Sequence, residues 1–364
     1  MYNFKKVIAF AATGAVLGVS SLTVQFSVSA DEAETETLSV SETISETDKA
    51  EPTETSPNEN IEYEKAPDSS YSFEYNDTNS TATLKKYNGS VENLILPEKI
   101  NKNGKEYIVS TIKQYAFKNN ERIKNVFVTS NYKTIEQWAF WGCKNLKTIE
   151  LSEGIENMGQ SVFNACSSLE NVVVPESVKE FKNKMFSNCS ALKKVVVKCK
   201  LNVVGMYMFD SCKNLEEVVL PDGITEFQDS CFKNCYSLKK ITVPDTVTAI
   251  GDNAFLECHE IDFLKIPDSV KTIGKNAFHR CGISTDYFNF KEINNFLLVA
   301  GKGSAAEIYA EENDYDMNSD TLSDKGPYFM TNESYEKYLK GLEEYESREK
   351  NPPAQKYVSY GDVN

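Results

Sequence analysis

A phenylalanine recurs every 23 residues through most of the chain, and this fixed interval constrains the fold more than any other feature. A cysteine follows seven of the eight phenylalanines at a distance of three residues. A period of about 20 to 50 residues predicts a solenoid, in which each turn covers the apolar face of the next turn. The phenylalanines are Phe117, Phe140, Phe163, Phe186, Phe209, Phe232, Phe255 and Phe278, and the cysteines are Cys143, Cys166, Cys189, Cys212, Cys235, Cys258 and Cys281.

Each 23-residue unit also contains an apolar alternation that predicts a short strand. In one unit Leu238 is followed by Ile241 and Val243, and the last two would point to the same face of a strand. A proline such as Pro244 then ends the strand, because proline lacks the hydrogen-bond donor of the ladder. A glycine in the second half of several units marks a bend where we expect a positive φ. These glycines are Gly159, Gly205, Gly251 and Gly274.

The full pattern C-x-x-L-x-x-I-x-I-P-x-x-V-x-x-I-G-x-x-A-F-x-x-C resembles the BspA-type leucine-rich repeat of surface and secreted proteins of bacteria and some protozoa. The resemblance extends over residues 67–318. It implies a right-handed leucine-rich repeat solenoid with short parallel strands, and a role in adhesion or protein binding without catalytic residues. Asn120 departs from the pattern by replacing the first cysteine, Lys198 and Ser152 replace prolines, and Lys182 and Gln228 replace glycines.

Segments at both ends of the repeat predict caps for the open ends of the core. Alternating aromatic residues from Tyr71 to Tyr75, a turn at Asn76-Asp77 and a second alternation from Ala82 predict a β-hairpin-like cap. After Cys281 the repeat degenerates, and a helix is expected to follow Gly303. Ser304 and Glu307 have the spacing of a capping box at the start of this C-terminal helical cap.

The chain before the repeat divides into two segments. Residues 1–30 combine a charged start, an apolar run and the small-x-small sequence Val28-Ser29-Ala30, which predicts a secretory signal peptide. An uncleaved membrane anchor is the alternative. Residues 31–66 contain twelve acidic residues against two lysines, a net charge of 2 − 12 = −10, and predict a disordered acidic Ser/Thr/Glu linker.

Residues 319–364 are expected to form a tail with one amphipathic helix followed by a linker. Tyr335, Tyr338 and Leu339 fall on one helical face, with Asn332 as the N-cap. The last four residues, Gly361-Asp362-Val363-Asn364, resemble the opening of a dockerin calcium loop. An alternative interpretation is therefore a structural or targeting subunit of an extracellular polysaccharide-degrading complex, truncated before a dockerin.

Catalysis and metal binding lack their usual residues in this sequence. The cysteines of the repeat are expected to be free thiols that fill the core, whereas Cys199 occupies a position held by acidic residues in other turns and is expected to be exposed. The two histidines, His259 and His279, are expected to be solvated. No metal-ligand spacing is present, no cofactor is expected, and the formal net charge of −15 disfavours nucleic acid as a partner.

The outward residues of the predicted strands remain as the candidate binding face. In three consecutive turns the outward residue between two inward ones is Val173, Val196 or Val219, which makes an apolar strip with a charged border. The alternative is that these valines serve only strand propensity. The other residues assigned to this face are Lys194, Glu217, Lys240, Phe263 and Lys265, and the two outward columns are expected to continue to Asp286 and Phe288.

A second candidate site consists of aromatic residues near the start of the repeat. Tyr115 and Trp138 occupy the same position in successive turns, and Trp141 follows Phe140. These rings could form a glycan-binding platform, with packing against the N-terminal cap as the alternative.

Taken together, the sequence predicts a secreted, extracellular, non-catalytic module that binds a protein of a host or bacterial surface. We expect a monomer that has no contact with a membrane after removal of the signal peptide. The strand face is the preferred binding site, and a glycan is the alternative ligand.

Overall fold

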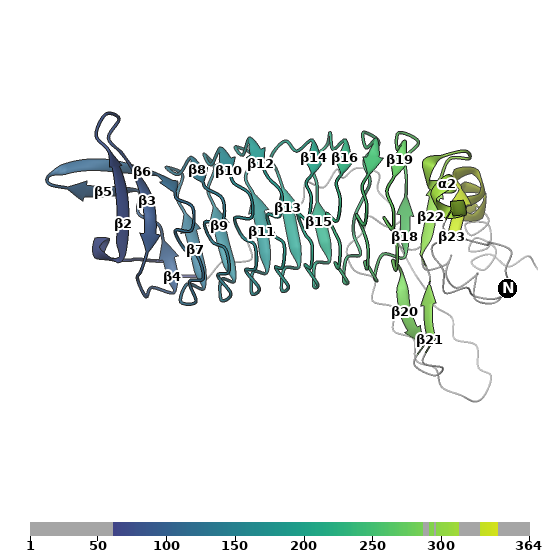
Figure 1. The fold of residues 1–364 in the computed structure, drawn as a ribbon, viewed down its shortest axis with the longest axis horizontal. Coiled ribbons are helices and arrows are strands. Elements are labelled where there is room, and N and C mark those ends of the chain that lie inside the picture. The colour runs from purple at the N-terminus through teal and green to yellow at the C-terminus, as the bar shows by residue number, and fades with distance from the viewer. Residues whose placement is uncertain (1–60, 287–290, 295, 313–327, 341–364) are drawn as a thin grey trace, which may run out of the picture.

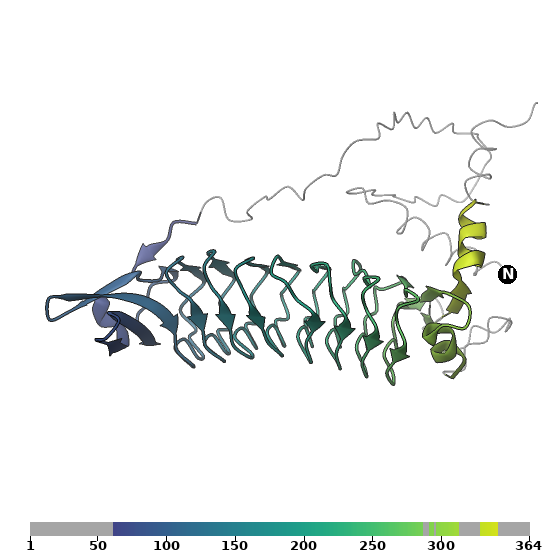
Figure 2. The same ribbon diagram turned by 90° about the horizontal axis from the view of Figure 1, so that it is seen from above.

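The computed structural model describes residues 61–286, 291–294, 296–312 and 328–340 of the chain. They form a long, nearly straight solenoid of stacked turns (Figures 1 and 2). The strands on one side pair in parallel, and equivalent residues of the regular turns are 23 positions apart, as in Val172 opposite Val195. This sheet contains β1 (Glu64–Lys65), β4 (Asn93–Ile95), β7 (Asn125–Val128), β9 (Thr148–Leu151), β11 (Asn171–Val174), β13 (Lys194–Val197) and β15 (Glu217–Val219). The predicted repeat solenoid with short parallel strands is confirmed.

Shorter strands on the opposite side of the core form two further sheets. The first contains β2 (Tyr71–Asn76), β3 (Thr81–Tyr87), β6 (Lys105–Ile112), β8 (Thr134–Ile135), β10 (Asn157–Met158) and β12 (Glu180–Phe181), and β5 (Lys99–Lys102) pairs with β6. The second contains β14 (Val203–Val204), β16 (Glu226–Phe227), β17 (Ala249–Ile250) and β19 (Thr272–Ile273). Both strand layers enclose one continuous hydrophobic core.

The recurring phenylalanines form a stacked ladder along this core. Rings of successive turns lie face to face with centroids 4.6 to 5.7 Å apart, from Phe117 to Phe278. All eight side chains are buried. Because each ring is covered by the ring of the next turn, a single turn lacks half of its own core, which explains why the sequence repeats without a break.

The cysteines beside this ladder are buried free thiols, as predicted. Each repeat cysteine also donates a hydrogen bond through its Sγ to the carbonyl oxygen of the phenylalanine 26 residues earlier, as from Cys212 to Phe186 at 3.0 Å. All seven make this bond at 3.0 to 3.2 Å. The carbonyl of Phe186 also accepts the backbone N–H of Cys189, so the thiol is a second donor that links this carbonyl to the next turn, a function that alanine could not perform.

Cys199 contradicts the prediction that its thiol is exposed. It is buried in the core, and burial raises the pKa of the Cys199 thiol to about 11. The position equivalent to Cys199 is exposed in neighbouring turns, as at Glu176 and Asp245, where a proline precedes it. In this turn Lys198 replaces the proline, and the side chain of Cys199 turns inward instead.

The glycines of the bend serve a different purpose from the one predicted. Positive φ angles occur instead two residues later, at residues such as Ser161 and Asn253. At Gly159 an added Cβ would lie 2.3 Å from the backbone nitrogen of Gln137, and at Gly274 it would lie 2.4 Å from that of Asp252. At Gly159 and Gly274 the close approach of the preceding turn leaves no room for a Cβ, although other turns have Lys182 or Gln228 at this position.

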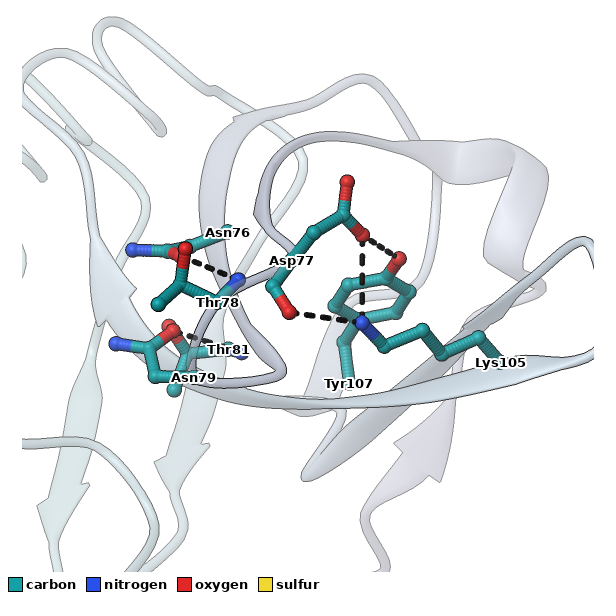
Figure 3. A network of polar contacts seen from close by, with 7 residues as sticks. All are labelled: Asn76, Asp77, Thr78, Asn79, Thr81, Lys105 and Tyr107. Carbon is teal, nitrogen blue, oxygen red and sulfur yellow. Dashed lines mark hydrogen bonds and ion pairs between the residues drawn. The ribbon is translucent and has the colours of Figure 1, made fainter.

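The N-terminal end contains the expected hairpin. Strands β2 and β3 pair with each other in antiparallel orientation. On its other side β3 pairs with β6 in parallel orientation. The turn between β2 and β3 is joined to the projecting β5–β6 hairpin through Asp77, which accepts hydrogen bonds from Tyr107 and Lys105 (Figure 3). The side chains of Asn76 and Asn79 each accept a hydrogen bond from a backbone N–H of the same turn. The ring of Tyr87 packs on the ring of Phe117, with the two centroids 5.5 Å apart. That this hairpin caps the core stays a prediction.

At the C-terminal end a second hairpin is inserted into the repeat. It consists of β20 (Ile283–Asp286) and β21 (Lys291–Asn294). On the side of the main sheet, β22 (Leu297–Ala300) pairs with β18 (Phe263–Lys265) and β23 (Tyr328–Thr331) in a separate three-stranded sheet. The outward columns therefore continue to Leu297 and Val299. Asp286 was assigned to these columns wrongly, and Phe288 lies outside the described residues.

Helix α2 (Ala305–Glu312) begins where the sequence predicted a helical cap. The backbone N–H of Glu307 donates to the hydroxyl of Ser304 at 3.3 Å, while the Glu307 carboxylate accepts from Gly303 and not from the Ser304 N–H of an ordinary capping box. The ring of Tyr309 packs edge-on against Phe278 at 5.5 Å. The helix thus contributes side chains to the end of the core.

The tail forms the expected helix, which spans 332–340 in the described part of the chain. Its N-cap is Thr331 and not Asn332, because the Thr331 hydroxyl accepts the backbone N–H of Ser334 at 3.2 Å. Figure 2 shows this helix and α2 on opposite sides of the last turns. The tail packs on the solenoid through a small separate cluster that includes Tyr335 and Met330.

Several segments of interest lie beyond the described residues. The predicted signal peptide, nearly all of the acidic linker and the dockerin-like end belong to residues 1–60 and 341–364. The last residues assigned to the linker are an exception, since Glu64 and Lys65 form β1 and pair with β4. In the part of the chain that the structure describes, no helix is long and apolar enough to cross a membrane.

Candidate protein-interaction face

The valine strip lies on three adjacent strands. Val173, Val196 and Val219 are direct neighbours in the parallel pairing of β11, β13 and β15. Val173 and Val219 are 44% and 36% exposed, and Val196 between them is half-buried. The alternate valines of the same strands, such as Val172 and Val195, point into the core. The strip is therefore a continuous apolar surface on the strand face, by which we mean the outer side of the main sheet and of the sheet β18-β22-β23 that follows it.

Charged side chains border this strip. Lys194 and Glu217 occupy equivalent positions on β13 and β15 and form an ion pair with a 3.1 Å separation. Lys240 in the next turn is exposed and is joined to Glu217 by a single β-bridge. Lys265 on β18 is also exposed. The structure thus brings together the valines and the charged residues predicted from the sequence.

The N-terminal part of the strand face is covered by a residue that the sequence analysis missed. The ring of Tyr63 packs on Phe127 at 5.7 Å, and its hydroxyl donates to the Glu150 carboxylate at 2.7 Å. Burial, together with this hydrogen bond, raises the pKa of Tyr63 above its usual value. Tyr63 precedes the two-residue strand β1, which was too short to produce a periodic signal.

The C-terminal part of the strand face is covered by the tail. Phe263 stacks on Tyr335 of the helix over 332–340 with ring centroids 5.2 Å apart. Leu297, Val299 and Met330 complete this second cluster and are buried. Phe263, which the sequence assigned to the binding face, therefore contributes to a contact within the chain. The open part of the face lies between Glu150 and Phe263, over the central turns.

A comparison with protein families identifies these turns. The profile described as BspA type leucine rich repeat region, with six copies, matches residues 86–216 and 192–298, which together span more than half of the chain. The chain belongs to this BspA-type leucine-rich repeat family. Leucine-rich repeat proteins are interaction modules whose stacked strands present extended binding surfaces.

Solved structures of other leucine-rich repeat proteins resemble this BspA-type chain. A T. pallidum leucine-rich repeat protein is 25% identical, with a TM-score of 0.48, over 54% of this chain and 91% of that one. A leucine-rich repeat protein from Eubacterium ventriosum is 26% identical, with a TM-score of 0.41, over 52% of this chain and 50% of that one. A leucine rich cell surface protein from Faecalibacterium prausnitzii is 20% identical, with a TM-score of 0.30, over 60% of this chain and 92% of that one. No curated protein matches the sequence.

The two histidines, His259 and His279, differ from each other in how far they are buried. His259 is half-buried, against expectation: its ring stacks on Tyr236 at 4.9 Å and its Nε2 is 2.6 Å from the Glu257 carboxylate. His279 is exposed, as predicted. Although burial acts to raise the pKa of Glu257, the contacts with His259 and Arg280 lower it overall. Within the described ranges, no group of three or more His, Cys, Asp or Glu residues is arranged to hold a metal ion.

The aromatic residues of the second candidate site contact one another. Tyr115 and Trp138 stack with ring centroids 5.4 Å apart and nearly parallel planes. Lys118 Nζ lies 4.7 Å from the ring centroids of both Tyr115 and Trp141. Part of the ring surface that would stack on a sugar is thus already in contact with protein atoms. Glycan binding by this cluster of the leucine-rich repeat stays a prediction.

Proposed function

We propose that this leucine-rich repeat protein is a secreted, non-catalytic module that binds a protein partner through the open central part of its strand face. The surface consists of Val173, Val196 and Val219 with Lys194, Glu217, Lys240 and Lys265. Adhesion to a host or bacterial surface is the role that this arrangement suits best. Secretion is proposed from the signal-like residues 1–30, whose removal would make Asp31 the first residue of the mature chain.

One observation carries the proposal. Val173 and Val219 are among the few large apolar side chains that the described part of the chain exposes. They lie on the two strands that flank the strand of Val196. Elsewhere in these turns most apolar side chains are packed in or against the core, and Met206 is the exposed exception. A grouped apolar strip with charged neighbours is typical of a protein-binding surface, because the partner can remove it from water while the charges fix the orientation.

Replacing Val196 and Val219 together with aspartate tests this surface. Because both side chains project away from the core, we expect a change in unfolding free energy of no more than about 0.5 kcal/mol per site. Partner binding should weaken by about 1 kcal/mol or more. The measurement is capture of proteins from host and bacterial surface extracts, followed by titration of the captured partner against the parent and the variant.

Met206→Asp is the matched control for this experiment. Met206 is similarly exposed in the same central turns, but it lies outside the strand face. This control should bind the partner like the parent protein. If the valine variant also binds like the parent, while Trp138→Ala with Trp141→Ala does not bind, the strand face is not the binding site and the glycan alternative replaces it.

Secretion is tested separately by determining the first residue of the protein recovered from the culture medium. A mature chain that begins at Asp31 is the expected result. A chain that retains residues 1–30 in the membrane fraction would instead support the membrane anchor.

A further inference from the structure

The charged border of the valine strip alternates in sign from turn to turn. The pair Lys193-Lys194 is followed one turn later by Glu216-Glu217 and one further turn later by Lys239-Lys240. Within the chain, Lys194 and Glu217 on β13 and β15 form an ion pair of 3.1 Å. The charge pattern therefore repeats after two turns, whereas the core repeats after one.

This alternation makes the strand face complementary to a second copy of itself. A two-fold axis that lies in the contact plane, parallel to the strands and between β13 and β15, places β13 of one copy opposite β15 of the other. Each outward column then faces the same column of the second copy. Lys194 faces Glu217 of the second copy, Glu217 faces its Lys194, and Val196 faces its Val219. The contact is isologous, because the same patch is used on both copies.

The neighbouring turns extend this complementarity. With the same axis, Glu170 faces Lys239 of the second copy and the exposed Val173 faces its Thr242, so no like charges meet at these positions. A two-fold axis along the length of the solenoid would instead place every strand opposite itself. Each strand would then run opposite its own copy in the reverse direction, and because residues 193–198 contain lysines but no acidic residue, Lys194 would meet no opposite charge. Only the first arrangement satisfies the charges of all the central turns.

A second copy also has the repeat spacing that this surface requires. Adjacent strands are about 4.8 Å apart in both copies, so the Lys–Glu pairs on the strands next to the axis come into register together. The alternating signs leave the patch with little net charge, which gives no preference for a strongly acidic or strongly basic ligand. We propose that the open central strand face mediates a homodimer of this chain. This inference rests on the proposed function of the same face and replaces the expectation of a monomer.

The ends of the strand face limit the size of this contact. Tyr63 covers one end, and the helix over 332–340 covers the other. Packed sheets cross at about 30°, so the two solenoids diverge away from the axis and their covered ends do not collide. Because the contact is restricted to the central strands, the expected dissociation constant is micromolar or weaker.

Charge reversal at the central pair tests the dimer. The full secreted chain is examined by sedimentation velocity between about 1 and about 500 μM, the range in which such a contact should form. The parent should show concentration-dependent dimerisation. Lys194→Glu and Glu217→Lys should each weaken it at least about tenfold, because each places two pairs of like charges across the axis.

Two experiments that should restore dimerisation distinguish a direct contact between the copies from damage to the fold. In the double variant Lys194→Glu with Glu217→Lys, the charges are exchanged but remain complementary, so dimerisation should return. An equimolar mixture of the two single variants should form a heterodimer, since every reversed charge then meets an opposite one. Thermal melts of all variants should match the parent, because these residues are on the surface.

The outcomes are decisive for the dimer without deciding the partner-binding proposal. A parent that stays monomeric at every concentration, or single variants that dimerise like the parent, would overturn the homodimer. The same holds if neither the double variant nor the mixture restores association. Binding of a captured partner that the paired valine substitutions abolish would still support the strand face as a partner site, whereas its persistence in that variant would refute the partner site and leave the homodimer to the charge-reversal variants.

Discussion

In the middle of the solenoid each phenylalanine ring is covered by the same ring of the next turn, whereas at the two ends the last ring meets a residue from outside the repeat. Phe209 lies between Phe186 and Phe232. At the ends, Phe117 is covered by Tyr87 and Phe278 by Tyr309. The repeat thus determines the structure of the middle completely, and each end needs a separate solution for its open core.

The largest expected effect comes from breaking the ladder in the middle. Phe209→Ala should lower the unfolding free energy by about 3 to 5 kcal/mol, because a fully buried ring leaves a cavity between two others. Denaturant melts give the loss. Phe278→Ala is the comparison at the end, where we expect local fraying that hydrogen exchange confines to the last turns. An equal loss of cooperativity for both variants would contradict a one-dimensional array.

A smaller effect is expected from the residue that covers the C-terminal end. The Tyr309 hydroxyl accepts the backbone N–H of Phe278 at 3.2 Å. Tyr309→Phe should cost about 1 to 3 kcal/mol, because it leaves a buried donor without this acceptor. Hydrogen exchange should increase only near Phe278. Tyr87→Phe at the other end, where the hydroxyl accepts the N–H of Val91 at 3.1 Å, should change exchange only there.

Asp262 lies where the regular turns meet the C-terminal end, and it should make stability depend on pH. Burial, with a further contribution from Glu260, raises the pKa of Asp262 to about 6, above an unfolded value of about 3.9. The stability contributed by the neutral carboxyl is present below about pH 4 and is lost as the pH rises through about 6. Asp262→Asn should therefore be more stable than the parent by about 1 to 2 kcal/mol above pH 6.

The control for this pH dependence is Asp245→Asn, at an exposed position one turn earlier. Melts of both variants across pH 4 to 8 measure the difference. The prediction fails if Asp262→Asn is no more stable than the parent at pH 7, or if the Asp245 variant shows the same pH dependence.

The smallest expected effect concerns the thiols of the middle turns. Burial raises the pKa of the Cys212 thiol well above its usual value, so this thiol should react slowly in the native protein. Cys212→Ala should cost about 1 kcal/mol through the lost bond to the Phe186 carbonyl. Cys212→Ser keeps a hydrogen-bond donor at this position. Comparing it with Cys212→Ala separates the effect of the lost hydrogen bond from the effect of the smaller side chain. After denaturation without reductant, all nine cysteines should titrate as thiols, and three or more disulfides by mass spectrometry would contradict this account.

The sequence was sufficient to predict the regular turns because their residues recur at one interval. The inward and outward positions of β11, β13 and β15, including Val173 and Val196, follow from that interval alone. It could not predict Tyr63 on the strand face, since its position depends on β1, a strand of two residues. The hairpin of β20 and β21 was also missed, because an insertion shifts the register without changing the composition.

Two further differences arose from contacts between turns. Cys199 was expected at the surface from its position in the repeat, but its small thiol side chain is buried in the core, whereas Glu153, which also lacks a preceding proline, is exposed. The bend glycines were predicted from local backbone preference, yet Gly159 is needed because of its distance to Gln137 in the preceding turn. Local sequence rules do not contain these distances, which exist only after the turns have stacked.

The hydrogen bond from each cysteine to a phenylalanine of the preceding turn bears on how such an array can change length. Donor and acceptor come from neighbouring units, so loss of residues 189–211 would bring Cys212 to the Phe163 carbonyl and leave no buried group unpaired. The core therefore tolerates the gain or loss of any whole unit. The alternation of charge at Lys194, Glu217 and Lys240 is preserved only when an even number of units is gained or lost. Duplication or deletion of a single unit can therefore alter the surface of this protein while its interior stays the same.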